Sequence, residues 1–147
     1  MTIATTIAAI QAVNATITGV ISYPTAIPGA IRSSDLPIVL VFVGRGRPER
    51  VSDFSLHFRD YYIRCYVKPI SQDVKPDAGY AQAYALLQLF VEKYLDDITL
   101  GGAVQHMGTG ARYEPPTMED SGIVVLEYAG VMYHGFEILI TTKEQIV

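Results

Sequence analysis

The sequence predicts an α+β fold, in which a mostly antiparallel β-sheet is flanked by two main helices and ends in a C-terminal β-hairpin. Three observations support this prediction. Apolar residues recur at steps of three and four in one segment near the N-terminus and in another after the middle of the chain. Two runs rich in β-branched and aromatic residues lie between these segments. The dipeptide Ala129-Gly130 then divides an apolar C-terminal region into two strands.

The first expected element is a helix with an uncharged polar side. Its apolar stripe consists of Ile3, Ile7, Ile10, Val13, Ile17 and Val20. The other side carries Thr, Gln and Asn, and the first charged side chain in the sequence is Arg32. Such a side is unusual for contact with water, so we expect a neighbouring subunit to cover it. Because polar residues interrupt the apolar ones, the segment fits neither a signal peptide nor a membrane span, and we expect a soluble intracellular protein.

Two strands follow an extended proline-rich connector. The first, "IVLVFVG" at residues 38–44, is expected to end at Gly44. The loop "GRGRPER", residues 44–50, leads to a second strand that Pro69 ends. Alternation in the second strand predicts a core-facing set, Tyr61, Ile63, Cys65 and Val67, and a set available to a partner, Tyr62, Arg64 and Tyr66.

The second helix is expected to begin near Ala78, with Asp77 as its N-cap. Its buried stripe is predicted to be Ala83, Leu87, Phe90 and Tyr94, widened by Leu86 and Val91. A strand fragment and a long exposed loop follow within residues 105–121. The hairpin at 123–141 has Gly130 at its turn and Gly135 at a predicted bulge. We expect one face of this hairpin to pack on the second helix.

Composition indicates a single domain, residues 1–147, that is large enough to fold without a disulfide or a metal. Half of the residues are hydrophobic and only 18% are charged, so we expect other subunits to cover some apolar surface. The net charge of −4 gives no general attraction to nucleic acid. The one cysteine, Cys65, excludes an intrachain disulfide.

No pattern in the sequence indicates catalysis. The glycine-containing stretches "GTGAR" and "GRGRPER" lack the Lys-Ser/Thr pair of a phosphate-binding loop and the dinucleotide-binding pattern. His57, His106 and His134 lie far apart, without a cysteine or an acidic residue at metal-ligand spacing. Cys65 occupies a core-facing strand position, so we expect it to be a small hydrophobic residue of the core and not a nucleophile. We therefore predict no enzymatic activity, no cofactor and no metal site.

The candidate functional residues belong instead to surfaces that bind partners. Arg45, Arg47 and Arg50 form a local basic cluster that could contact a phosphate backbone or an acidic protein surface; a solvated loop is the alternative. The segments 44–50 and 105–121 are rich in glycine and proline, and we expect them to be exposed partner-binding loops. At the hairpin tip, the candidate interface residues are Val131, Met132 and Tyr133.

Two C-terminal stretches, "TLGGAVQHMGTGARY" and "VVLEYAGVMYHGFEILITTKE", resemble those of small neck proteins of long-tailed bacteriophages. The resemblance is greatest to the tail terminator, or tail completion, proteins of siphophages. The corresponding positions are Leu100, Gly101, Gly102, Tyr128, Gly130, Tyr133, Gly135, Leu139 and Thr141. Thr141 departs from the pattern, because an apolar residue is commoner there. The order of helices and strands is also similar over most of the chain.

This resemblance implies a virion protein, assembled in the host cytoplasm, that forms a hexameric ring at the head-proximal end of the tail tube. The ring would stop tube polymerisation and join the tail to the head. Its partners would be the tail tube protein on one side and a head connector or stopper protein on the other. Genomic DNA would pass through without sequence-specific binding, and no membrane would be involved.

Three other interpretations remain open at this stage. One is a head-completion or connector protein that joins the portal to the tail, and another is a tail-tube or baseplate-associated subunit. The third is a small enzyme whose site the sequence does not reveal.

Overall fold

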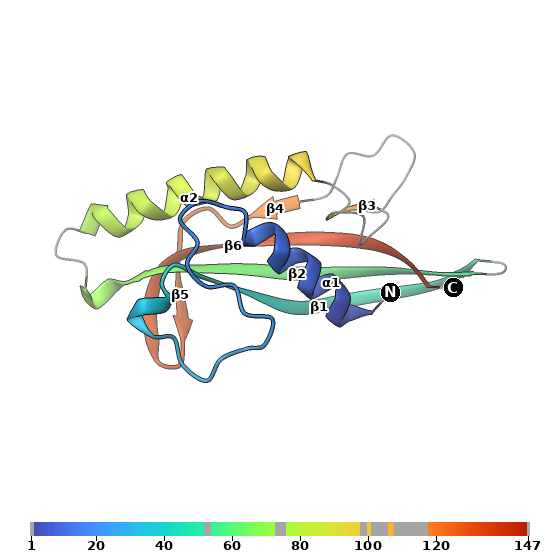
Figure 1. Cartoon of the computed structure of the whole chain (residues 1–147), viewed down its shortest axis with the longest axis horizontal. Helices are drawn as coiled ribbons and strands as arrows, with labels where there is room; N and C mark the ends of the chain where they lie inside the picture. The colour runs from blue at the N-terminus through green and yellow to red at the C-terminus, as the bar shows by residue number, and fades with distance from the viewer. Residues whose placement is uncertain are drawn as a thin grey trace.

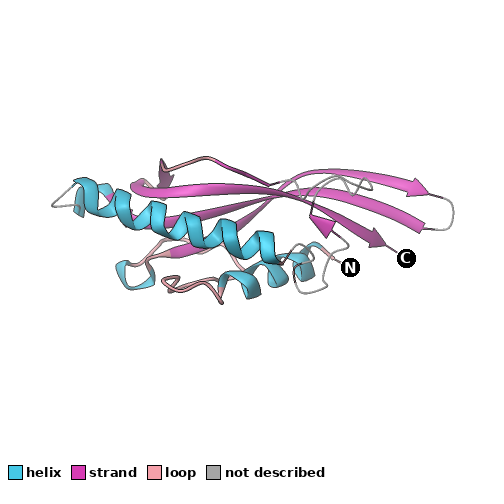
Figure 2. Cartoon of the chain, turned by 90° about the horizontal axis from the view of Figure 1, so that it is seen from above, coloured by secondary structure: helices cyan, strands magenta, loops and turns pink. Residues whose placement is uncertain are grey.

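The computed structural model describes residues 2–51, 54–72, 76–97, 100, 106–107 and 118–146. These residues confirm the predicted α+β fold with its C-terminal hairpin. The α-helices are α1 (Ile3–Asn14) and α2 (Pro76–Asp96), and short 3-10 helices occur at Ser33–Asp35 and Ile70–Gln72. The strands are β1 (Ile38–Val51), β2 (Phe54–Pro69), β3 (His106–Met107), β4 (Met118–Asp120), β5 (Val124–Tyr128) and β6 (Val131–Ile146). Both α-helices lie on the same face of the sheet (Figure 2).

The sheet is antiparallel, and its centre is the pair β2–β6. This pairing runs from Ser55 opposite Ile146 to Pro69 opposite Tyr133. The outer neighbour of β2 is β1, and the far edge of β6 pairs in turn with β5, β4 and β3. The three long strands continue past the helices as a ribbon (Figure 1). We call this ribbon, residues 44–51, 54–60 and 141–146, the arm.

The main core lies between the helices and the sheet. Phe90 of α2 packs edge-on against Phe136 of β6, with 5.2 Å between ring centroids. The buried side chains are Ile10, Val13, Ile17, Val39, Val41, Tyr61, Ile63, Cys65, Val67, Ala83, Leu86, Phe90, Tyr94, Leu100, Phe136, Ile138 and Ile140. The predicted core-facing set of β2 is therefore confirmed. In α2, however, Leu86 is buried and Leu87 only partly so.

A second, smaller core lies on the opposite face of the sheet, which we call the back face. Tyr66 is buried there and makes edge-on contacts with Tyr128 and Tyr133, with ring centroids 5.5 and 5.6 Å away. Ile31 and Leu36 of the connector also cover it. The prediction that Tyr66 is available to a partner is therefore wrong, because the connector and β5 fold over it.

The polar side of α1 is buried within its own chain at three positions, Thr6, Gln11 and Asn14. The Gln11 amide nitrogen donates hydrogen bonds to the carbonyl oxygens of Pro24 (2.7 Å) and Val39 (2.9 Å). The Asn14 amide nitrogen donates to the Gln11 side-chain oxygen at 2.9 Å, and the Tyr94 hydroxyl donates to Asn14. This chain of hydrogen bonds connects α1 to β1 and to α2. For these residues, the prediction that a neighbouring subunit provides the cover is wrong.

Strand β1 does not end at Gly44, and the predicted loop 44–50 is strand. Its pairing with β2 shifts register between Val43 and Gly46, which is a β-bulge, and then continues to Val51 opposite Phe54. Pro48 is tolerated because β1 is an edge strand, where a missing N–H breaks no hydrogen bond to an outer neighbour. Of the candidate loop 105–121, only residues 106–107 and 118–121 are described, and the predicted loop is wrong at Met118–Asp120, which form strand β4.

Helix α2 begins at Pro76, so Asp77 lies in its first turn and is not the predicted N-cap. Proline is favoured as the first helical residue, because the N–H it lacks would have no partner within the helix there.

The C-terminal hairpin is present, and its turn is as predicted. Ala129 and Gly130 have φ angles of 50° and 82°, in the left-handed region that a two-residue hairpin loop needs. The predicted bulge lies on the opposite strand: the register shifts between Tyr66 and Lys68, so the extra residue belongs to β2. Gly135 pairs with Tyr66, and its lack of a side chain lets the two backbones approach closely.

The two hairpin strands pack on different layers. On β6, Phe136, Ile138 and Ile140 face α2 and belong to the main core, as predicted. On β5, Leu126 and Tyr128 pack in the second core instead. The expected packing on α2 is therefore correct for β6 and wrong for these two residues of β5.

Candidate interaction surface

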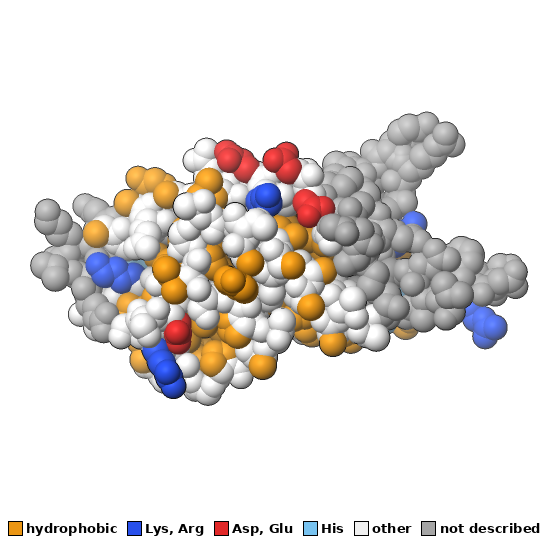
Figure 3. Space-filling view, viewed as in Figure 1, with side chains coloured by type: hydrophobic (Ala, Val, Ile, Leu, Met, Phe, Trp, Pro, Cys, Tyr) orange, Lys and Arg blue, Asp and Glu red, His pale blue; other side chains and the backbone are white. Residues whose placement is uncertain are grey.

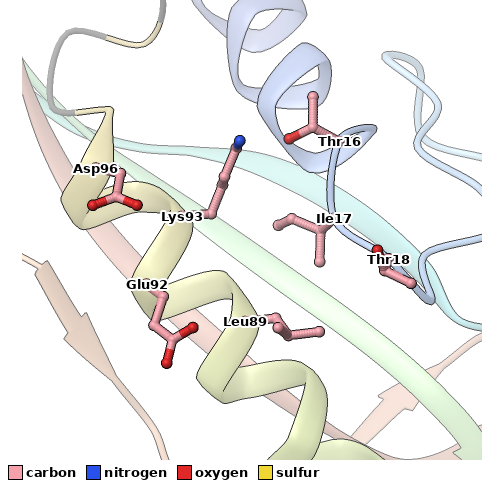
Figure 4. A pocket seen from close by; sticks show the side chains of 7 residues that line it. All are labelled: Thr16, Ile17, Thr18, Leu89, Glu92, Lys93 and Asp96. Carbon is pink, nitrogen blue, oxygen red and sulfur yellow. The ribbon is translucent and has the colours of Figure 1, made fainter.

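A hollow lies between α2 and the turn that follows α1. Its volume is about 210 Å³, and it is lined by Thr16, Ile17, Thr18, Leu89, Glu92, Lys93 and Asp96. Lys93 extends towards Thr16, whereas the carboxylates of Glu92 and Asp96 point away from it (Figure 4). The lining residues include neither a histidine nor a cysteine.

Within the described part of the chain, no three His, Cys, Asp or Glu side chains are placed to hold a metal ion together. The helices formed by these residues are too short or too polar to span a bilayer.

Cys65 is completely buried in the main core. Burial disfavours the thiolate and raises the pKa of this thiol well above its usual range. Because the thiolate is the nucleophilic form of cysteine, Cys65 is chemically inert in the folded chain.

This burial predicts that the free energy of unfolding decreases above about pH 8.5. Cys65 has a raised pKa in the folded state, so it keeps its proton there, whereas the unfolded chain loses it above about pH 8.5. The unfolded state then binds fewer protons, and stability falls by up to about 1.4 kcal/mol per pH unit. Urea denaturation between about pH 8 and 9.5 should show this slope for the wild type and lose it for Cys65→Ala. Equal slopes for the two proteins would contradict the assignment.

The structure separates the three candidate arginines. Arg45, in the bulge, and Arg47 line a back-face hollow of about 430 Å³ together with Gly46, Phe58, Asp60 and Thr141. The Arg47 guanidinium carbon lies 5.0 Å from the Phe58 ring centroid, a cation–π distance. Arg50 lies farther along the arm, opposite Ser55, and strand alternation places it on the other face from Arg47. All three side chains are exposed, but only two of them belong to one surface.

Between this hollow and the second core, the back face carries aromatic side chains and one ion pair. Phe42, Tyr62 and Leu139 form a row across three strands and are half-buried. Beside them, Arg64 forms an ion pair with Glu137, with 2.5 Å between nitrogen and oxygen. The Arg64 guanidinium also lies 4.8 Å from the Phe42 ring centroid. This part of the back face therefore has little net charge.

The hairpin tip retains two of its three candidate interface residues. Val131 and Met132 are exposed, Met132 by 49%. Tyr133 is only 3% exposed and belongs to the second core, so its prediction as an interface residue is wrong. Val125 of the neighbouring strand β5 is exposed by 52% and adds to the apolar surface.

A further exposed apolar surface lies on α2. Tyr80 and Tyr84 are 51% and 54% exposed, and their rings meet edge-on at 5.8 Å. Leu95 lies on the same side of the helix. Figure 3 shows hydrophobic side chains gathered over the N-terminal half of α2. The sequence signal for this surface was the spacing of four residues between the two tyrosines, which places them side by side on one face of a helix. Ile21 and Ile27 of the connector are exposed too, and no sequence pattern distinguishes them.

The sequence was also compared with models of known protein families and with curated proteins. No family model matches it, and no curated protein matches it.

Proposed function

We propose that this chain is a structural virion protein of a long-tailed bacteriophage, namely a tail terminator whose subunits form a hexameric ring. The ring sits at the head-proximal end of the tail tube, stops tube polymerisation and offers the surface to which the head is joined. Its partners are the tail tube protein on one side and a head connector or stopper protein on the other. Genomic DNA passes through the ring.

The arm is the observation that carries this proposal. Three strands extend past both helices, so the helices do not cover this part of the sheet (Figure 1). From Leu40 to Val51, β1 pairs with β2 on one side only, within the described residues. A projecting ribbon with an unpaired edge favours aggregation of a monomer, but it is a docking site in an assembly.

The exposed apolar side chains give independent support. Those of α2 and of the hairpin tip lie at separate places on the surface. Several apolar surfaces on one small chain are typical of a subunit that contacts more than one neighbour. A terminator in the neck has such neighbours on each side: the adjacent ring subunits, the tube and the head. The resemblance of the two C-terminal stretches to terminator proteins points the same way.

Electron microscopy of phage particles lacking this protein tests the proposal. A terminator mutant is expected to produce overlong tails that carry no heads, and the wild-type gene supplied in trans should restore normal particles. Tails of normal length beside heads that have lost their DNA would overturn the proposal and favour a head-completion protein. Absence of tails altogether would favour a tube or baseplate role.

Met132→Asp is expected to impair assembly while leaving the fold intact. Its side chain is half exposed at the hairpin tip, so a carboxylate there remains hydrated in the free subunit but would be buried in an apolar contact. Circular dichroism should show an unchanged melting transition, and complementation of the mutant phage should fall. Ser34→Asp, at an exposed connector position, is the matched control. Normal complementation by folded Met132→Asp would show that the tip contacts nothing.

A further inference from the structure

The two edges of the sheet carry opposite charges. On the β1 edge, Arg45, Arg47 and Arg50 are exposed, and Glu49 is the one acidic residue of that strand. On the opposite edge, Glu119 and Asp120 of β4 and Glu127 of β5 are exposed, and neither strand contains Lys or Arg. We call these the cationic edge and the acidic edge.

We infer that the subunits associate head to tail, with the cationic edge of one copy against the acidic edge of the next. This inference rests on the proposed ring and names the contact that closes it. Opposite charges on neighbouring strands attract, whereas two cationic edges in contact repel each other. The charges therefore disfavour a symmetric dimer through β1 and favour the repeated heterologous contact that forms rings.

Strand direction is compatible with this contact. The successive pairs β1–β2, β2–β6 and β6–β4 are all antiparallel, so β1 and β4 run in opposite directions. When a second copy lies beside the first with the same face outward, its β4 is antiparallel to β1. The two sheets would then continue as one antiparallel sheet.

The side chains also lie on matching faces. Arg47 is on the back face, over the Phe58 ring. Glu119 is opposite Leu139 of β6, and directly opposed residues share a face, so Glu119 is on the back face as well. Asp120 lies on the helix face by alternation, as Arg50 does. On the back face, the contact would thus bring Arg47 together with Glu119. With these two residues opposed, the antiparallel register places Asp120 opposite Gly46, so Arg50 and Asp120 contribute only to the general charge of their edges.

The positions of the charges require the copies to be staggered. Glu119, Leu139, Tyr62 and Phe42 form one row across the sheet. Arg47 lies five residues beyond Phe42 along β1, which corresponds to roughly 15 Å along the strand. Pairing Arg47 with a neighbour's Glu119 therefore shifts each sheet along its strands relative to the next. A stagger of this kind is what a continuous sheet needs in order to close on itself.

Charge reversal with mixing tests this contact in solution. Arg45→Glu/Arg47→Glu makes both edges acidic, and Glu119→Lys/Asp120→Asn removes the acidic pair of β4 and adds a cation. The asparagine keeps the oxygen that accepts the Gly122 backbone N–H. At low ionic strength and about millimolar concentration, sedimentation velocity should show wild-type association. Each variant alone should associate at least about tenfold more weakly, because like charges then meet.

An equimolar mixture of the two variants should recover association. Acidic-edged and cationic-edged copies then alternate, and a ring with an even number of members can close completely. Native mass spectrometry should therefore show equal numbers of the two variants in the assembled species. Arg32→Glu and Glu92→Lys, exposed charges outside both edges, are the matched controls and should associate as the wild type does.

Three results would overturn the inference: wild-type association of either double variant alone, no recovery in a mixture of folded variants, or a wild type that stays monomeric. If a charge-reversed variant does not fold, the neutral variant Arg45→Gln/Arg47→Gln replaces it, and its association should lose most of the wild type's salt dependence. The outcome is separable from that of the proposed function. Overlong tails in the phage mutant together with salt-independent association would retain the terminator and reject this contact.

Discussion

Gly135→Ala is expected to destabilise the folded chain by about 3 kcal/mol or more. A methyl group at this position would lie 2.1 Å from the carbonyl oxygen of Cys65 and 3.0 Å from a methyl carbon of Leu126. The closer neighbour is backbone of β2, so no side-chain rotation can relieve the overlap. The two central strands would have to separate at the point where β5, β6 and β2 meet.

Urea denaturation monitored by circular dichroism measures this effect. Gly29→Ala is the control, because nothing lies within 4 Å of the methyl group that it adds. We expect the control to stay within about 0.5 kcal/mol of the wild type. If Gly135→Ala is equally stable, the close approach of the two backbones is not a constraint on this sheet.

The second large effect is expected for Asn14→Leu, at about 3 kcal/mol of lost stability. Asn14 is fully buried, accepts a hydrogen bond from the Tyr94 hydroxyl and donates one to the Gln11 side chain. Leucine has a similar size but leaves the Tyr94 hydroxyl and the Gln11 side-chain oxygen without the hydrogen bonds that Asn14 makes to them inside the core. The cost of burying an unpaired hydroxyl and an unpaired amide oxygen accounts for most of the loss.

A double-mutant cycle distinguishes this explanation from altered packing. Tyr94→Phe removes the hydroxyl, so Asn14→Leu/Tyr94→Phe should be at least about 1 kcal/mol more stable than the sum of the single losses predicts. Additive losses in urea denaturation would mean that the Asn14–Tyr94 hydrogen bond contributes nothing of its own.

The elements with a strong local period could be predicted from the sequence. Alternation identified the buried face of β2, and the dipeptide at 129–130 identified the hairpin turn, because both signals come from neighbouring residues. The predicted stripe of α2 is confirmed at Ala83, Phe90 and Tyr94, whereas Leu86, expected only to widen it, is more buried than Leu87. Residues 86 and 87 both lie near the margin of the stripe, where the helical period alone does not rank them.

The errors concern features that depend on distant partners. Residues 44–50 have the glycine, proline and arginine content of a loop, yet pairing with β2 makes them strand. For Tyr66, alternation gives the face on which it lies, but the groups that cover that face come from residues far away in sequence. Gln11 is similar, because its acceptors at Pro24 and Val39 become neighbours only in the folded chain.

For the candidate surface too, the sequence revealed the features that depend on neighbouring residues and missed those that depend on distant ones. The three arginines were visible as a cluster, but their distribution over two faces follows from the bulge and the strand register. The opposite charge of the two sheet edges was not foreseeable, because nothing near residues 118–120 reveals that they form an edge strand beside β6.

The pairing of β2 with β6 also determines when the protein can fold during synthesis. Tyr61 lies opposite Ile140, so β6, the partner of the central strand β2, is made after the other strands that the described residues form. Contacts between residues so distant in sequence form slowly. Until β6 arrives, a nascent chain presents β2 as an open apolar edge, to which a second nascent chain on the same messenger RNA can pair. Slow translation upstream of residue 131 would therefore lengthen the period in which aggregation competes with folding.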